Sequence, residues 1–202
     1  PKDELLSVEE IGRVTNIFSD LGIKKIRITG GEPLVRRNFR DIVETINNIE
    51  DIEEINITTN GIRLSEELEF LKDKKIHSLN ISLDTLKKDL FKEITGGGDL
   101  DKVLFSLHRA IELKFKRIKL NVVLVRGKND SEIMDFVNLT EKYPIDIRFI
   151  ELMPIGLGKE YVPISNDEVK DIILKEKKLT PFDEKIGSGP AIYYKTEKGI
   201  GC

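Results

Sequence analysis

The sequence predicts an α/β fold, a partial (β/α) TIM-like barrel in which a parallel sheet carries helices on its outside. First, stretches with a strand pattern alternate five times with stretches of helical pattern, which favours parallel strands joined by right-handed crossovers. Second, each strand has one apolar and one polar face, and a polar face on a helix-covered sheet must line something, as in a barrel lumen. Third, polar residues recur at the carboxyl ends of the strands, where barrel enzymes place their working residues.

The elements are predicted in the following order. A first helix begins after Ser7, which has the capping-box spacing to Glu10; its apolar stripe runs from Val8 to Leu21, and Gly22 is placed to end it. Strands with a period of two are expected at 25–29, 54–59, 78–83, 117–125 and 145–150. Helices are expected near 38–48, 65–74, 86–94, 100–114 and 131–142, then a helix near 166–177 and a strand at 191–196.

For domain organisation, we expect residues 1–155 to form a truncated barrel core and residues 156–202 to begin an incomplete C-terminal extension. The chain starts at Pro1 without a methionine and ends on Cys202, so we expect a piece of a longer protein.

Composition excludes several classes of protein. The net charge of −3 gives no hint of nucleic acid or an anionic membrane as a partner. No apolar run approaches the roughly 18 residues of a membrane span, and no signal peptide is visible. A single cysteine, Cys202, excludes an internal disulfide and any metal or cluster site built from this chain's cysteines alone. We therefore expect a cytoplasmic protein, since one free thiol fits a reducing compartment.

Two glycines follow the strand at 25–29. Gly30 and Gly31 allow a positive φ or a close approach of the backbone to a ligand, and Glu32 lies just outside the strand end. The alternative is a tight turn that needs glycine for its geometry alone. The recurrence of polar residues at the ends of the later strands favours the ligand.

Three cations lie on the predicted polar faces: Arg27, Lys119 and Arg148. A buried cation is costly without a partner, so these need carboxylates or a bound anion. Internal pairing is one alternative, with the candidates Glu32, Asp84, Asp146 and Glu151. The other is an anionic ligand such as a nucleotide phosphate, which suits arginine and lysine donors. Lys119 could also be the Schiff-base lysine of a barrel aldolase, although no acid–base pair can be specified for it.

The run from Ile26 to Arg37, IRITGGEPLVRR, resembles the GGEP segment of radical S-adenosylmethionine enzymes. In particular it is similar to the molybdenum cofactor biosynthesis protein A family, the GTP 3′,8-cyclases. The similarity continues through 58–61, 80–84, 119–123 and 148–156 and covers nearly the whole chain. GGEP alone would indicate only a radical S-adenosylmethionine enzyme, whereas the full set is typical of the cyclases.

The resemblance implies a role for each matching position. Contacts with S-adenosylmethionine are implied for Gly30, Gly31, Glu32, Ser82 and Met153, the first three at its methionyl amino and carboxyl groups. Contacts with GTP are implied for Arg27, Thr58, Lys119 and Arg148. The implied reaction converts GTP to the cyclic pterin precursor, beginning with hydrogen abstraction from the GTP ribose by a 5′-deoxyadenosyl radical. A handover of the product to the next pathway enzyme is also implied, and a homodimer is left open.

The chain departs from the family pattern in its cysteines. The family carries a CxxxCxxC motif for a [4Fe–4S] cluster and a second cysteine trio, and Cys202 matches neither. Family members also tend to have an arginine soon after the position of Gly96, where this chain has Gly97 and Gly98. No catalytic residue or metal ligand is therefore assigned, and the chain by itself is expected to be inactive. The alternatives are a radical enzyme acting on another substrate, such as a peptide or a haem precursor, and a non-catalytic nucleotide-binding or scaffold barrel domain.

Overall fold

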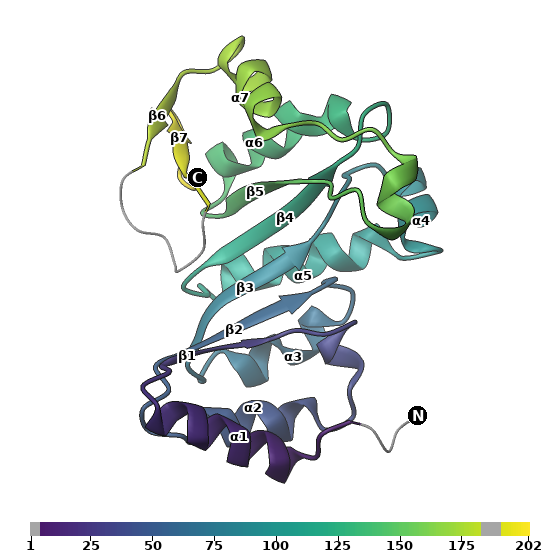
Figure 1. The fold of residues 1–202 in the computed structure, drawn as a ribbon. Coiled ribbons are helices and arrows are strands. Elements are labelled where there is room, and N and C mark those ends of the chain that lie inside the picture. The colour runs from purple at the N-terminus through teal and green to yellow at the C-terminus, as the bar shows by residue number, and fades with distance from the viewer. Residues whose placement is uncertain (1–4, 183–190) are drawn as a thin grey trace. The chain divides into compact units, whose positions relative to one another are not determined.

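The computed structural model describes residues 5–182 and 191–202. Figure 1 shows strands and helices that alternate along the chain. The strands are β1 Lys25–Ile28, β2 Glu54–Thr59, β3 Ile76–Ser82, β4 Ile118–Leu124, β5 Asp146–Glu151, β6 Leu179–Pro181 and β7 Tyr194–Thr196. The α-helices are α1 Val8–Asp20, α2 Phe39–Asn47, α3 Leu64–Leu71, α4 Lys88–Thr95, α5 Leu100–Glu112, α6 Ile133–Lys142 and α7 Asn166–Leu174. Short 3-10 helices are η2 Pro33–Val35, η3 Asp130–Glu132 and η4 Gly156–Glu160.

The predicted α/β fold is confirmed. The first five strands form one sheet in the order β1-β2-β3-β4-β5, and the β1–β2 and β4–β5 pairs are parallel. The sheet is open among the residues that the structure describes, as expected for part of a barrel rather than a closed one. Every predicted element is present in the expected order, but the strand expected at 191–196 is confirmed only at Tyr194–Thr196. Its antiparallel partner β6 was not expected.

The chain divides into two compact units. The first consists of Pro1–Asn80 with Lys102–Lys116, and the second of Ile81–Asp101 with Arg117–Cys202. The expected boundary between a core at 1–155 and an extension at 156–202 stays a prediction, and residues 1–4 and 183–190 of those ranges lie outside the described residues.

In the first unit, β1 and β2 carry the predicted period of two. Ile55 and Ile57 are completely buried, whereas Glu54, Asn56 and Thr58, which alternate with them on β2, are half-buried. Local signals also hold, because Ser7 and Glu10 form the capping box at the start of α1. Gly22 follows the helix end with a φ of +90°, as expected for a residue that ends a helix.

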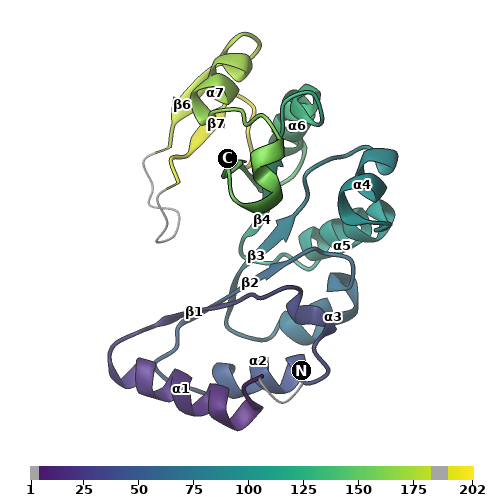
Figure 2. The same ribbon diagram turned by 45° about the vertical axis from the view of Figure 1, so that its right-hand side comes forward.

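The packing of α1 differs from the expectation. Figures 1 and 2 agree that α1 lies beside α2. An apolar stripe normally faces a core, but the buried residues of α1 are Gly12, Thr15 and Ser19. The physical reason is close approach of two helices, because a Cβ on Gly12 would lie only 2.7 Å from Thr45 Cγ2. Part of the predicted stripe is consequently exposed, namely Val14, Ile17, Phe18 and Leu21.

In the second unit, α6 and α7 pack on β5, and β6 pairs with β7. Leu120, Val122 and Phe136 are buried, and the Phe136 ring meets the Phe149 ring edge-to-face with centroids 6.4 Å apart. The last described residues run along β5, where Ile147 N donates to the carbonyl of Cys202 at 2.7 Å. None of the helices in the described part of the chain has the length and apolar character needed to cross a membrane.

Candidate functional site

The glycine turn after β1 has an open surface. Gly30 has a φ of +153°, so its backbone conformation favours glycine. Gly31 has no positive φ, and a Cβ placed on it would meet nothing within 4 Å. The backbone conformation of the turn therefore explains the glycine at position 30. Neither conformation nor packing explains the glycine at position 31, but the lack of a side chain there leaves the backbone accessible to a ligand.

Glu32 connects the ends of β1 and β2. Its Oε1 accepts from Leu34 N at 3.1 Å and from Thr59 Oγ1 at 2.7 Å, and its Oε2 accepts from Asn60 N at 2.6 Å. These bonds fix the loop after β1 against the loop after β2. Each carboxylate oxygen can accept about two hydrogen bonds, so Oε2 retains capacity for one more donor, such as an ammonium group.

The polar faces of the strands contain buried atoms without partners. In the first unit, Asn80 Nδ2 donates to Ile57 O and Ser78 Oγ, both at 3.1 Å, but Asn80 Oδ1 accepts no bond among the described residues. Thr58 Oγ1, on β2, is also buried without a partner in this part of the chain. In the second unit, the described residues offer no partner to Asn121 Oδ1 on β4 or to Arg148 Nε on β5. Such atoms are uncommon in folded proteins and call for an explanation, of which a bound ligand is one.

The candidate carboxylates accept hydrogen bonds from groups other than Arg27 and Arg148. Asp146 accepts from Arg117 Nε at 2.7 Å, although it stands opposite Lys119 in the β4–β5 register. The other three accept hydrogen bonds from backbone amides: Glu32 as described, Asp84 from Val123 N, and Glu151 from Asn166 N. Within the described ranges, neither Arg27 nor Arg148 forms an ion pair. Internal pairing therefore does not account for Arg148, which is half-buried, whereas Arg27 is exposed to solvent and, contrary to the expectation of a buried cation, needs no partner.

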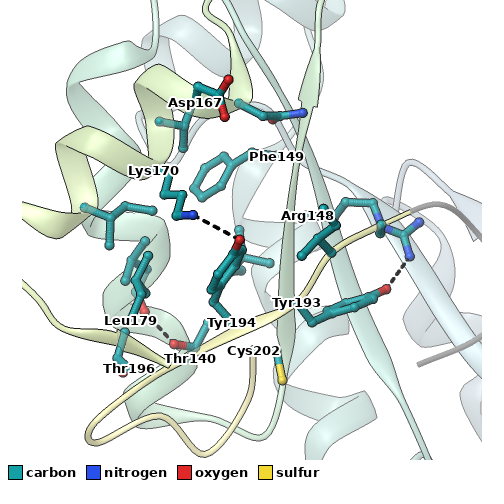
Figure 3. A pocket seen from close by; sticks show the side chains of 17 residues that line it. Thr140, Arg148, Phe149, Asp167, Lys170, Leu179, Tyr193, Tyr194, Thr196 and Cys202 are labelled. Carbon is teal, nitrogen blue, oxygen red and sulfur yellow. Dashed lines mark hydrogen bonds between the residues drawn. The ribbon is translucent and has the colours of Figure 1, made fainter. Parts of the chain in front are cut away.

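Lys119 and Arg148 are brought together by Tyr193. Lys119 is buried on β4, with its Nζ 5.9 Å from the centroid of the Tyr193 ring. Arg148 Nη2 donates to Tyr193 Oη at 2.8 Å, as Figure 3 shows. Sequence reasoning missed Tyr193, because the adjacent tyrosines at 193 and 194 carry no spacing signal that links them to β4 or β5.

The loop after β3 is held by side chains that the sequence did not indicate. Asn129, which is buried, donates to the carbonyls of Asp84 at 2.7 Å and Val123 at 2.8 Å. Its Oδ1 accepts from Val125 N at 2.8 Å. Burial raises the pKa of Asp84 above its ordinary value, and the hydrogen bond from Val123 N opposes this. The loop that follows the predicted ligand residue Ser82 is thus firmly positioned.

A cavity of about 330 Å³ lies in the second unit, bounded by β5, α6, α7 and the β6–β7 pair. Figure 3 shows Phe149 and Lys170 among the side chains that line this cavity, with Lys170 directed at the hydroxyl of Tyr194. Lys170 Nζ lies 3.1 Å from Tyr194 Oη. Met153, expected near an adenosine, is 67% exposed beyond the end of β5 and does not line the cavity.

The structure distributes the predicted site residues over the two units. The first unit holds Arg27, Gly30, Gly31, Glu32 and Thr58, and the second holds Ser82, Lys119, Arg148 and Met153. Within each unit the structure joins Glu32 to the end of β2 and Arg148 to Tyr193. The assignment of these residues to a cofactor or a substrate stays a prediction.

The two implied cofactors fit the chain unequally. An iron–sulfur cluster is held by several cysteine thiolates, and this chain has one cysteine. Among the described residues there is also no group of three or more His, Cys, Asp or Glu that could hold a metal ion. The residues present therefore do not fit a cluster. The open backbone at Gly31 and the free acceptor capacity of Glu32 do fit the amino-acid end of S-adenosylmethionine.

Comparison with known proteins gives close relatives. The chain is 48% identical over 196 residues to the GTP 3′,8-cyclase of Clostridium perfringens strain SM101, covering 96% of this chain and 60% of that protein. It is 45% identical over 208 residues to the GTP 3′,8-cyclase of Limosilactobacillus fermentum, covering 100% of this chain and 61% of that protein. The chain thus spans about 60% of the length of these relatives.

A solved structure shares the fold. The crystal structure of Streptococcus suis SuiB bound to S-adenosylmethionine matches with a TM-score of 0.70 at 20% identity, covering 84% of this chain and 41% of that one. The family model described as "Radical SAM superfamily" matches residues 1–140. Because this match covers more than half of the sequence, the chain belongs to the radical SAM superfamily.

Proposed function

We propose that this chain is the core of a GTP 3′,8-cyclase, which converts GTP to the cyclic pterin precursor of the molybdenum cofactor. The observation that carries the proposal is the 45–48% identity to proteins of that name over nearly the whole chain. Because the chain spans about 60% of those relatives, the activity is proposed for a whole protein that contains it.

S-adenosylmethionine is the proposed cofactor, and it supplies the hydrogen-abstracting radical when it is bound. In the first unit, the backbone at Gly30 and Gly31 would approach its methionyl group, and Glu32 Oε2 would accept from its ammonium. In the second unit, Ser82 would hydrogen-bond its polar groups and Met153 would pack near its adenosine. The chain's own contribution is to bind and orient the cofactor, since it lacks the thiolates for a cluster. For the same reason we expect no turnover from these 202 residues alone.

GTP is the proposed substrate. Its phosphates require cations that are not already neutralised, and Arg148 satisfies this because it forms no ion pair within the described ranges. Lys119 adds a buried ammonium on the neighbouring strand. In the first unit, Arg27 and the unpartnered hydroxyl of Thr58 are the proposed contacts. A cytoplasmic location, a homodimer and transfer of the product to the next enzyme of the pathway belong to the same proposal.

Binding measurements on a purified protein that contains this chain test the proposal. We expect GTP and S-adenosylmethionine each to raise its melting temperature, since a ligand that binds only the folded state stabilises it. Lys119→Gln and Arg148→Gln should each weaken GTP binding by about ten-fold or more, the loss expected for a hydrogen bond to a charged group. Arg126→Gln is the control, because Arg126 pairs with Glu168 on the surface.

The outcomes separate the alternatives. A protein that binds S-adenosylmethionine but not GTP would be a radical enzyme with another substrate, such as a peptide or a haem precursor. A protein that binds neither ligand would be a scaffold. GTP binding that is equally strong in Lys119→Gln, Arg148→Gln and the control would refute the proposed substrate residues.

A further inference from the structure

We propose that Tyr193 is a positioning residue for the anion site of this protein. Its hydroxyl holds the guanidinium of Arg148 and its ring packs against the ammonium of Lys119, and neither contact neutralises a positive charge. The identity of the anion as a GTP phosphate rests on the proposed function. The positioning itself rests on the geometry of the second unit alone.

Tyr193 contacts both cations from one buried place. The residue is 9% exposed, its hydroxyl accepts from Arg148 Nη2 at 2.8 Å, and its ring centroid lies 5.9 Å from Lys119 Nζ. Figure 3 shows Arg148 directed from β5 toward this hydroxyl, on the side of the strand away from Phe149 and Lys170. A cation at this distance from an aromatic face is attracted to it.

The chemical nature of the partner matters as much as its position. A carboxylate at the same place would hold Arg148 but would neutralise it. A phenol accepts the hydrogen bond and leaves the positive charge intact. The guanidinium has five N–H donors in a rigid fork, and Tyr193 takes only one of them at Nη2. The rest of the fork is held in one orientation and stays available to a phosphate.

Arg148 also has an unsatisfied donor. Its Nε is buried and has no acceptor among the described residues. A buried donor without an acceptor destabilises the folded state, so an arginine serving only a structural role should have found one. The uncharged partner Tyr193 and the unsatisfied Nε together indicate that Arg148 binds a ligand rather than forming an internal ion pair.

The chain contains a matched control in the next residue. Tyr194 also has a hydroxyl in contact with a cation, Lys170 Nζ at 3.1 Å, and its ring centroid lies 4.7 Å from the same nitrogen. The substitutions Tyr193→Phe and Tyr194→Phe therefore each remove one hydroxyl from a tyrosine–cation pair and keep the ring. Only the first touches Arg148.

The first experiment measures the dissociation constant of GTP by calorimetry in a purified protein that contains this chain. Losing the preorganisation of one long side chain weakens binding by about three- to ten-fold. We expect this loss in Tyr193→Phe and less than about a two-fold change in Tyr194→Phe. In the Arg148→Gln background, Tyr193→Phe should have no further effect, because the two residues act as one unit. GTP binding by Tyr193→Phe at the wild-type strength would overturn the proposal.

The second experiment needs no ligand. In protein labelled with ¹⁵N-arginine, the Nε–H signal of Arg148, assigned by its loss in Arg148→Gln, should shift and its side chain should become more mobile in Tyr193→Phe. It should be unaffected in Tyr194→Phe. An identical Arg148 signal in wild type and Tyr193→Phe would overturn the proposal. If the wild-type protein does not bind GTP, the proposed function fails, and this spectroscopic result alone then decides the role of Tyr193.

Discussion

Replacing Glu32 by glutamine should loosen the connection between the ends of β1 and β2. The carboxylate accepts three hydrogen bonds, from Leu34 N, Thr59 Oγ1 and Asn60 N. An amide has one oxygen and one NH₂ group, and the NH₂ cannot accept. If the amide oxygen occupies the place of Oε1, Asn60 N loses its acceptor. If it occupies the place of Oε2, Leu34 N loses its acceptor. One backbone donor is stranded in either orientation.

The size of the effect follows from the charge of the acceptor. A hydrogen bond to a charged group contributes about 1.5–3 kcal/mol, so Glu32→Gln should lower the free energy of unfolding by about that amount. For a protein of this size, 1 kcal/mol corresponds to about 2–4 °C, which gives a drop of about 3–12 °C in melting temperature. Thermal and urea unfolding, followed by circular dichroism, measure both quantities.

The matched control is Glu66→Gln. Glu66 forms an exposed ion pair with Arg63, three residues earlier on the chain, and such pairs contribute at most about 1 kcal/mol. Equal unfolding midpoints for Glu32→Gln and Glu66→Gln would refute the reasoning, because the carboxylate of Glu32 would then not be holding the two loops together.

Three further substitutions are predicted from the structure. Asp84→Asn keeps the acceptor for Val123 N and removes a charge whose burial raises the pKa of Asp84. A raised acid pKa makes wild-type stability fall as pH rises from the ordinary to the raised value, so the variant should lose this slope and be more stable than wild type at neutral pH. Gly12→Ala should destabilise by about 1–3 kcal/mol through overpacking, despite the better helix propensity of alanine, because the new Cβ lies 2.7 Å from Thr45 Cγ2. Asn129→Ala removes the hydrogen-bond partner of three backbone groups, Asp84 O, Val123 O and Val125 N. It should lower the free energy of unfolding by about 3 kcal/mol or more.

Each of these has a control. For Asp84, the stability of wild type and of Asp84→Asn is compared by urea unfolding from acid to neutral pH. Parallel curves for the two proteins would show that folding does not raise the pKa of Asp84, and this would contradict the prediction. For Gly12, Thr45→Ser removes the offending Cγ2, so a double variant as unstable as Gly12→Ala would show that the contact is not the cause. For Asn129, an unchanged free energy of unfolding in Asn129→Ala would show that these three bonds do not hold the loop, which would contradict the prediction.

Sequence patterns that depend on neighbours along the chain predicted the structure well. The alternation of Ile55 and Ile57 with polar residues gave the position and buried face of β2, since side-chain direction in a strand has a period of two. The start of α1 was predicted from Ser7 and Glu10 because a capping box joins residues only three apart. The need for glycine at position 30 followed from the turn that must end β1.

Contacts between distant segments could not be predicted in this way. The apolar stripe of α1 indicated one face, yet the helix buries Gly12, Thr15 and Ser19, because the face that packs depends on how closely α2 approaches. The sequence also left the partners of the carboxylates open. It offered Arg27, Lys119 and Arg148 as partners for Asp146, whereas in the structure Asp146 accepts a hydrogen bond from Arg117.

The sequence by itself determined the order of strands and helices, the polar character of one face of the sheet and the family signature of the glycine turn. All of these are encoded over a few residues by backbone sterics and side-chain period. Only the tertiary structure decided that Glu32 reaches the loop after β2 and that Tyr193 holds Arg148, 45 residues away. Hydrogen bonds between side chains far apart in sequence depend on the path of the whole chain, and no local pattern specifies that path.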